Sequence, residues 1–83
     1  MRTRWSFFRG LDGRYGLRVW AFRRMGRRWE IVSRLLVPAI HETRPLALEG
    51  LLAAVAEGMP SVLTLAELKG AVPLHWKGVL GWL

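Results

Sequence analysis

Residues 3–37 read TRWSFFRGLDGRYGLRVWAFRRMGRRWEIVSRLLV, and this stretch decides the fold. Apolar and polar side chains alternate in three of its parts, Thr3 to Arg9, Tyr15 to Arg23 and Arg27 to Val37. These parts are rich in Trp, Phe, Val and Ile, which strands favour. Because successive side chains of a strand point to opposite faces of a sheet, the alternation predicts three β-strands.

Two separators divide the predicted strands, Leu11-Asp12-Gly13 and Arg24-Met25-Gly26. Each has glycine in third place, as in a three-residue hairpin loop whose type I turn is followed by a left-handed residue. Closing both loops in this way predicts an antiparallel meander in which odd-numbered residues meet odd-numbered residues. The expected pairs are Trp5 with Val19, Phe7 with Leu17, Val19 with Ile31 and Ala21 with Trp29.

The two faces of this predicted meander differ in charge. One is almost free of charge and is the predicted core face, with Trp5, Phe7, Leu17, Val19, Ala21, Trp29, Ile31 and Leu35. The other interleaves charged and aromatic side chains: Arg4, Ser6, Phe8, Arg18, Trp20, Phe22, Arg28, Glu30, Val32 and Arg34. A one-residue slip would exchange the faces, so burial of the apolar face specifies the register.

After Val37-Pro38 the apolar spacing becomes helical. A first predicted helix has Pro45 in its first turn, ends at Gly58 and Pro60, and carries Leu48, Leu51, Leu52, Val55 and Met59. Thr64 and Glu67 have capping-box spacing and predict a short helix that ends at Gly70. A third predicted helix opens at Pro73 and lines one side with Trp76, Val79, Leu80 and Leu83.

The chain is therefore expected to be an α+β protein, a three-stranded antiparallel β-meander followed by two or three helices packed on one sheet face. Its 83 residues suit a single domain, with a basic meander at 1–37 and a helical half at 45–83. The least charged stretch, Pro45 to Ala66, is interrupted by charges and a proline, so we expect no membrane span. With no cysteine, a reducing compartment fits, and we expect a cytoplasmic protein.

Basic residues are concentrated before Pro45. Residues 1–44 hold eleven arginines and three acidic residues, a formal charge of +8, whereas residues 45–83 hold two lysines and three acidic residues, a formal charge of −1. With a sequence pI of about 11.6, this asymmetry favours a polyanionic partner for the first half, and nucleic acid leads among these.

The charge-rich sheet face is the main candidate site. Guanidinium groups that follow phosphates, beside aromatic planes that receive bases, suit single-stranded nucleic acid, DNA or RNA. The predicted nucleic-acid-binding residues are Arg4, Phe8, Arg18, Trp20, Phe22, Arg24, Arg28 and Arg34, with Lys77 from the helical half. The alternative is that the rest of the chain or a second subunit covers Trp20 and Phe22.

The second half resembles the three helices of a helix-turn-helix domain of the winged-helix kind found in bacterial regulators. The likeness covers about 38 residues and rests chiefly on Thr64-Leu65-Ala66-Glu67-Leu68 before a short turn and an apolar-periodic helix. It implies that the last helix would present His75 and Lys77 to the major groove. Few polar side chains on that helix and a net negative half depart from the family pattern, so the sheet is the preferred surface.

No residue pattern predicts catalysis, a metal site or a cofactor. His41-Glu42 begins like a zinc-protease helix motif, but Pro45 stands where the second histidine would be. Glu30 is expected opposite Trp20, where an ion pair with an arginine is its ordinary role. We therefore expect a non-enzymatic binding protein.

A protein partner is the alternative to nucleic acid. Arg and Trp are enriched at protein hot spots, so the same face would suit a small interaction module such as a phage-type inhibitor or an assembly subunit. Trp82 falls outside the predicted seam of the last helix and is expected to contact a second copy, most simply in a homodimer, or a partner protein. Alternatively, Trp82 folds back onto the first helix.

Overall fold

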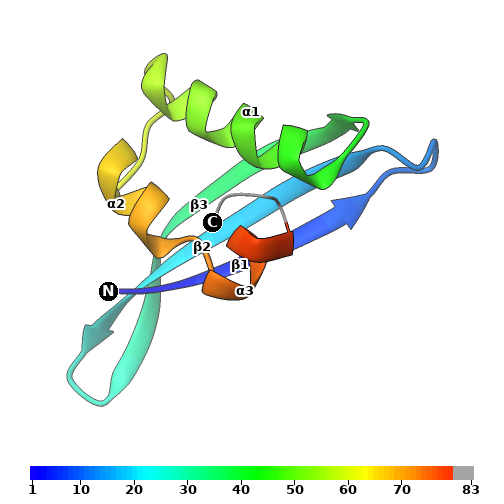
Figure 1. Cartoon of the computed structure of the whole chain (residues 1–83). Helices are drawn as coiled ribbons and strands as arrows, with labels where there is room; N and C mark the ends of the chain where they lie inside the picture. Colours follow the sequence, from blue (N-terminus) through cyan, green and yellow to red (C-terminus); the bar gives the residue numbers. More distant parts are fainter. Residues whose placement is uncertain (80–83) are drawn as a thin grey trace.

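The computed structural model describes residues 1–79, with the side chains of residues 1–76 (Figure 1). One antiparallel sheet has the strand order β1-β2-β3 and is formed by β1 (Arg2–Arg9), β2 (Tyr15–Met25) and β3 (Arg28–His41). Three helices follow, α1 (Arg44–Ala56), α2 (Leu65–Ala71) and α3 (Leu74–Val79). The predicted α+β class is confirmed, and β3 runs four residues beyond the predicted end at Val37.

The first hairpin has the predicted three-residue loop. The backbone N–H of Gly10 donates to the carbonyl oxygen of Arg14 at 2.9 Å, and the N–H of Gly13 donates to the carbonyl oxygen of Gly10 at 3.0 Å. Gly13 has a φ of 82°, the left-handed conformation that this loop needs. The predicted pairs Trp5 with Val19 and Phe7 with Leu17 are confirmed.

The second hairpin differs from the prediction. Met25 lies opposite Arg28, so the turn has two residues, Gly26 and Arg27, instead of the predicted three. Gly26 has a φ of 63° and no described non-glycine residue has a positive φ, which is the pattern of a type II′ turn with glycine first. Strand β2 continues through Arg24 and Met25, which the prediction places in the loop.

A β-bulge on β3 then changes the register. Ala21 lies opposite Ser33 and Phe22 opposite Ile31, so Val32 is an extra residue without a partner. The predicted pairs of Val19 with Ile31 and of Ala21 with Trp29 are therefore wrong. Val19 lies opposite Leu35, and Ala21 lies opposite Ser33. The two-residue turn places Trp29 opposite Arg24 and Ile31 opposite Phe22, on the side of the sheet away from the helices.

Burial on the helix side explains the bulge. A two-residue turn pairs odd with even residues, so without an extra residue Leu35 and Val37 would point away from the helices. Val32 restores them to the core face, where both are buried. Burying such side chains contributes about 1.5–3 kcal/mol each. Trp29 and Ile31 are the residues exchanged outward, at 40% and 44% exposure, so their predicted place in the core is wrong.

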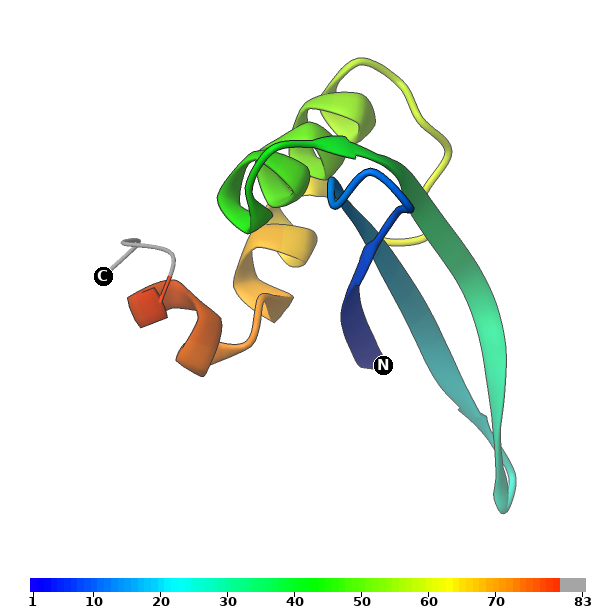
Figure 2. The ribbon, with the colours of Figure 1, turned by 90° about the vertical axis from the view of Figure 1, so that its right-hand side faces the viewer.

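Helix α1 covers the core face, as Figure 2 shows from the side. It begins where predicted: the Thr43 hydroxyl accepts from the N–H of Leu46 at 3.4 Å, and Pro45 occupies the first turn. Four residues at helical spacing are buried against the sheet, namely Ala47, Leu48, Leu51 and Leu52. They meet the side chains of Leu17, Val19, Leu35 and Val37 in one core.

The two short helices complete that layer. The predicted capping box is confirmed: the Thr64 hydroxyl accepts from the N–H of Glu67, and the Glu67 carboxylate accepts from the N–H of Thr64. In α3, the Trp76 ring stacks on Phe7 at 4.5 Å between ring centres and meets Trp5 edge-on at 6.1 Å. Leu80 and Leu83 of the predicted seam lie outside the described residues.

Candidate nucleic-acid interface

The sheet face opposite α1 carries no helix in the described part of the chain (Figure 2). Even-numbered residues of β1 and β2 point to this face, and the pairing adds alternate residues of β3. We term it the outer face; it holds Arg2, Arg4, Ser6, Phe8, Arg18, Trp20, Phe22, Trp29, Ile31, Arg34 and Leu36. The interleaving of arginines with aromatic residues predicted from the alternation is thus present on one surface.

Trp20 lies at the centre of the outer face. It stands opposite Arg4 on β1 and Arg34 on β3, and Arg18 precedes it by two residues on β2. A shallow pocket of about 340 Å³ beside it is lined by Arg18, Trp20, Arg34, Leu35 and Leu36. The Arg4 guanidinium carbon lies 6.0 Å from the Trp20 ring centre. The structure therefore brings three predicted site residues, Arg18, Trp20 and Arg34, into one pocket.

Phe8 supports Arg18. The Phe8 ring occupies the space where a side chain at Gly16, its partner on β2, would lie. The guanidinium carbon of Arg18 lies over the same ring, 4.4 Å from its centre. A guanidinium on an aromatic face gains about 0.5–1 kcal/mol at exposed sites. Phe8 thus holds an arginine in place, and the ring face covered by Arg18 is not free to receive a base.

Four residues of this surface were not predicted there from the sequence, namely Arg2, Trp29, Ile31 and Leu36. The Arg2 guanidinium carbon lies 4.6 Å from the centre of the Trp29 ring, which had been assigned to the core. Treating Gly26 as the first residue of a two-residue turn would have placed Trp29 on the outer face, because glycine in that position is the signature of a type II′ turn.

The other predicted residues are distributed as follows. Phe22 is half-buried beside Trp20, and Arg24 lies on the same side further along β2. Arg28 lies opposite Met25 and Glu30 opposite Arg23, both on the other side of the sheet, because the turn is one residue shorter than predicted. The expected position of Glu30 opposite Trp20 is therefore wrong; Arg34 occupies it. The side chain of Lys77, and Trp82 altogether, lie outside the described part of the structure.

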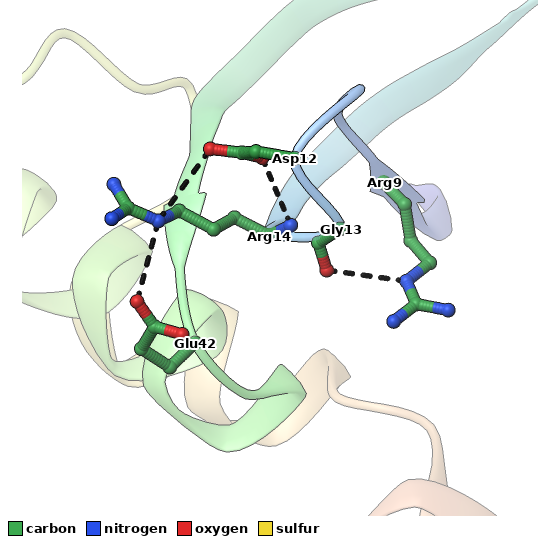
Figure 3. Close-up of polar contacts among 5 residues, drawn as sticks. All are labelled: Arg9, Asp12, Gly13, Arg14 and Glu42. Carbon is green, nitrogen blue, oxygen red and sulfur yellow. Dashed lines mark hydrogen bonds and ion pairs between the residues drawn. The ribbon is translucent and has the colours of Figure 1, made fainter.

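The arginines of this face have no carboxylate partner among the described residues. Arg14 is the only arginine of the described part in an ion pair: its Nε lies 3.5 Å from Asp12 and 3.3 Å from Glu42 (Figure 3). That pair ties the first hairpin loop to the segment before α1, at the end of the sheet remote from Gly26. The positive charge of the outer face is consequently not neutralised by neighbouring side chains.

The arrangement is suited to binding anions and planar groups. Guanidinium groups donate in pairs to phosphate oxygens, and an indole ring offers a stacking plane. Within residues 1–79 no three His, Asp or Glu side chains lie close enough to hold a metal ion, and no helix there is long and apolar enough to cross a membrane. No protein-family model, curated protein or solved structure matches this chain.

Proposed function

We propose that this protein binds nucleic acid through the outer face of its sheet, without catalysing a reaction. The observation that carries the proposal is the pocket that the side chains of Arg18, Trp20 and Arg34 line together. Around it the arginines lack carboxylate partners in the described chain, so their charge is available to a polyanion.

The chemistry follows from the two kinds of side chain. Arg18 and Arg34 would donate to phosphate oxygens, while the Trp20 ring would contact a base or a sugar at the pocket. Base–aromatic stacking contributes about 1–3 kcal/mol per base, and each neutralised phosphate adds a salt-dependent gain from counterion release. Neither side-chain type supplies a nucleophile or a general base at neutral pH, which favours binding over catalysis.

Three expectations from the sequence analysis remain predictions and are part of this proposal. They are the cytoplasmic location, the homodimer through Trp82 and the helix-turn-helix resemblance of residues 46–83. The resemblance would place a second contact at His75 and Lys77; His75 is exposed.

A protein-interaction module is the second candidate. The outer face also carries exposed apolar side chains, Trp29, Ile31 and Leu36. Apolar side chains next to Arg and Trp are the composition of protein hot spots. A protein interface of this kind would hold as salt rises, whereas binding through phosphate contacts would weaken steeply.

Fluorescence anisotropy with labelled oligonucleotides tests the proposal. We expect micromolar or tighter binding at low salt, with the logarithm of affinity falling linearly with the logarithm of salt concentration. The variant Arg18→Ala/Arg34→Ala should flatten this slope by about one to two units. The matched control is Arg9→Ala/Arg14→Ala, which removes the same two charges away from the outer face and should bind nearly as the wild type does.

Absence of binding to every single- and double-stranded oligonucleotide at low salt would overturn the proposal. Equal losses in the two double variants would also overturn the assignment to this face, because they would show that net charge alone governs binding. Thermal melting of each variant checks that the fold is retained; all four arginines are exposed, so little change is expected.

A further inference from the structure

The second hairpin extends beyond the rest of the sheet. Arg2, the first residue of β1, lies opposite Phe22, so β2 and β3 continue past that point as a two-stranded ribbon (Figures 1 and 2). We term residues 23–30 the arm. Three further residues of β2 give it a reach of about 10 Å before the turn.

The arm carries much of the positive charge of the chain. Four of its eight residues are arginines, at positions 23, 24, 27 and 28, against one acidic residue, Glu30. No ion pair involves these arginines in the described chain. The tip is stiffened by the Gly26 turn and by Arg24, whose Nε donates to the carbonyl oxygen of Gly26 at 3.0 Å.

These charges lie on both sides of the ribbon. The pairing places Arg24 and Trp29 on the side of the outer face, and Arg23 and Arg28 on the opposite side, with Arg27 in the turn. A partner that covers only the outer face would leave Arg23 and Arg28 in solvent. A partner with negative charge along two facing walls would engage both sides at once.

We infer that the arm enters the major groove of double-stranded DNA, an inference that rests on the proposed function. The major groove of B-form DNA is about 12 Å wide and about 8.5 Å deep, admits a two-stranded β-ribbon, and is bordered by phosphates on both sides. The reach of the arm matches that depth. The major groove of A-form RNA is too narrow for side chains to read, so duplex DNA is the favoured ligand over duplex RNA.

The aromatic side chains of the outer face support a duplex rather than a single strand. Single-strand binders offer free aromatic planes to successive bases. Here Arg18 covers a face of Phe8 and Arg2 covers a face of Trp29, so Trp20 is the ring left for stacking and guanidinium groups lie over the other two. The phosphates of a duplex could accept hydrogen bonds from the guanidinium groups of Arg2 and Arg18 without displacing them from these rings.

The test compares three probes of one sequence: a 20-base-pair DNA duplex, the single DNA strand and the RNA duplex. Wild-type protein should bind the DNA duplex about tenfold or more tightly than either other probe. The variant Arg27→Ala/Arg28→Ala should lose about tenfold in duplex affinity and flatten the salt slope by about two units, since each phosphate contact accounts for about 0.9. Its binding to the single strand should change little.

Each other outcome separates the inference from the proposed function. Equal or tighter binding to the single strand, or an arm variant that binds the duplex like Arg9→Ala/Arg14→Ala, would overturn the arm inference and leave the outer face as the site. Tighter binding to the RNA duplex would overturn the assignment to DNA. Loss of duplex binding in the arm variant with a normal Arg18→Ala/Arg34→Ala variant would support the arm while overturning the outer-face pocket.

Discussion

The guanidinium carbon of Arg18 lies 4.4 Å from the centre of the Phe8 ring, across the pair of strands that forms the first hairpin. Phe8 leans over Gly16 because nothing but hydrogen stands there, and a contact with an aromatic face limits the freedom of the arginine. An ordered arginine loses less conformational entropy when it binds a phosphate. Gly16 thus affects the affinity of the outer face for phosphate, because it makes room for the Phe8 ring that orders Arg18.

Replacing Gly16 by alanine should destabilise the protein by about 1–3 kcal/mol, as overpacking does. The new methyl group would meet the Phe8 ring and lie 2.6 Å from the carbonyl oxygen of Val37. Urea denaturation measures the change. Gly70→Ala is the matched control: apart from its chain neighbours and the backbone of its own helix, no atom lies within 4 Å of the added group, and in helix α2 this change should stabilise by about 0.4–1 kcal/mol. Equal effects of the two changes would contradict the packing of Phe8 over Gly16.

Trp29→Ala should change the free energy of unfolding by less than about 1 kcal/mol, because Trp29 is 40% exposed on the outer face. Trp5→Ala should cost about 3–5 kcal/mol, since Trp5 is buried under α3 and its ring meets Trp76. Chemical denaturation of both variants checks the contrast. A large loss for Trp29→Ala would restore the predicted loop at Arg24-Met25-Gly26 and contradict the bulge.

Deleting Val32 tests the bulge directly. Ile31 lies opposite Phe22 and Ser33 opposite Ala21, so removing the unpaired residue between them leaves a regular ladder that keeps both the two-residue turn and the burial of Leu35 and Val37. The deletion should therefore cost about 1 kcal/mol, close to the cost of Val32→Ala, which shortens the same side chain. Circular dichroism and urea denaturation give the result. A loss of about 3–6 kcal/mol, the value of burying Leu35 and Val37, would show that Val32 is a paired residue of β3 and contradict the bulge.

Trp20→Leu should weaken the binding of single-stranded oligonucleotides, whose bases are free to stack, while Trp20→Phe should retain most of it. Leucine fills space but offers no stacking plane, and loss of one stacked base is worth about 1–3 kcal/mol, a factor of about 5 to 150 in affinity. Anisotropy titrations at fixed salt measure the difference. Similar affinities for the leucine variant and the wild type would assign the pocket a purely structural role.

The elements that were predicted correctly depend on residues close together in the chain. The Leu11-Asp12-Gly13 loop, the Thr43 cap before Pro45 and the Thr64–Glu67 capping box each involve hydrogen bonds within three or four residues. Such signals are legible in a single sequence because neighbouring residues supply both partners. The first hairpin, and with it the register of Arg4 and Arg18 on one face, followed from them.

The bulge at Val32 depended instead on residues far apart. A three-residue and a two-residue turn both fit the residues around Gly26, and the choice decides the face of Trp29 and Ile31. It could not be made locally, because a three-residue loop without a bulge and a two-residue turn with a bulge at Val32 both bury Leu35 and Val37 against helix α1. The sequence by itself determined the strands, the helices and the basic outer face. Only the tertiary structure decided the length of the arm and which aromatic rings lie on that face, since burial is a property of elements packed together and not of a segment alone.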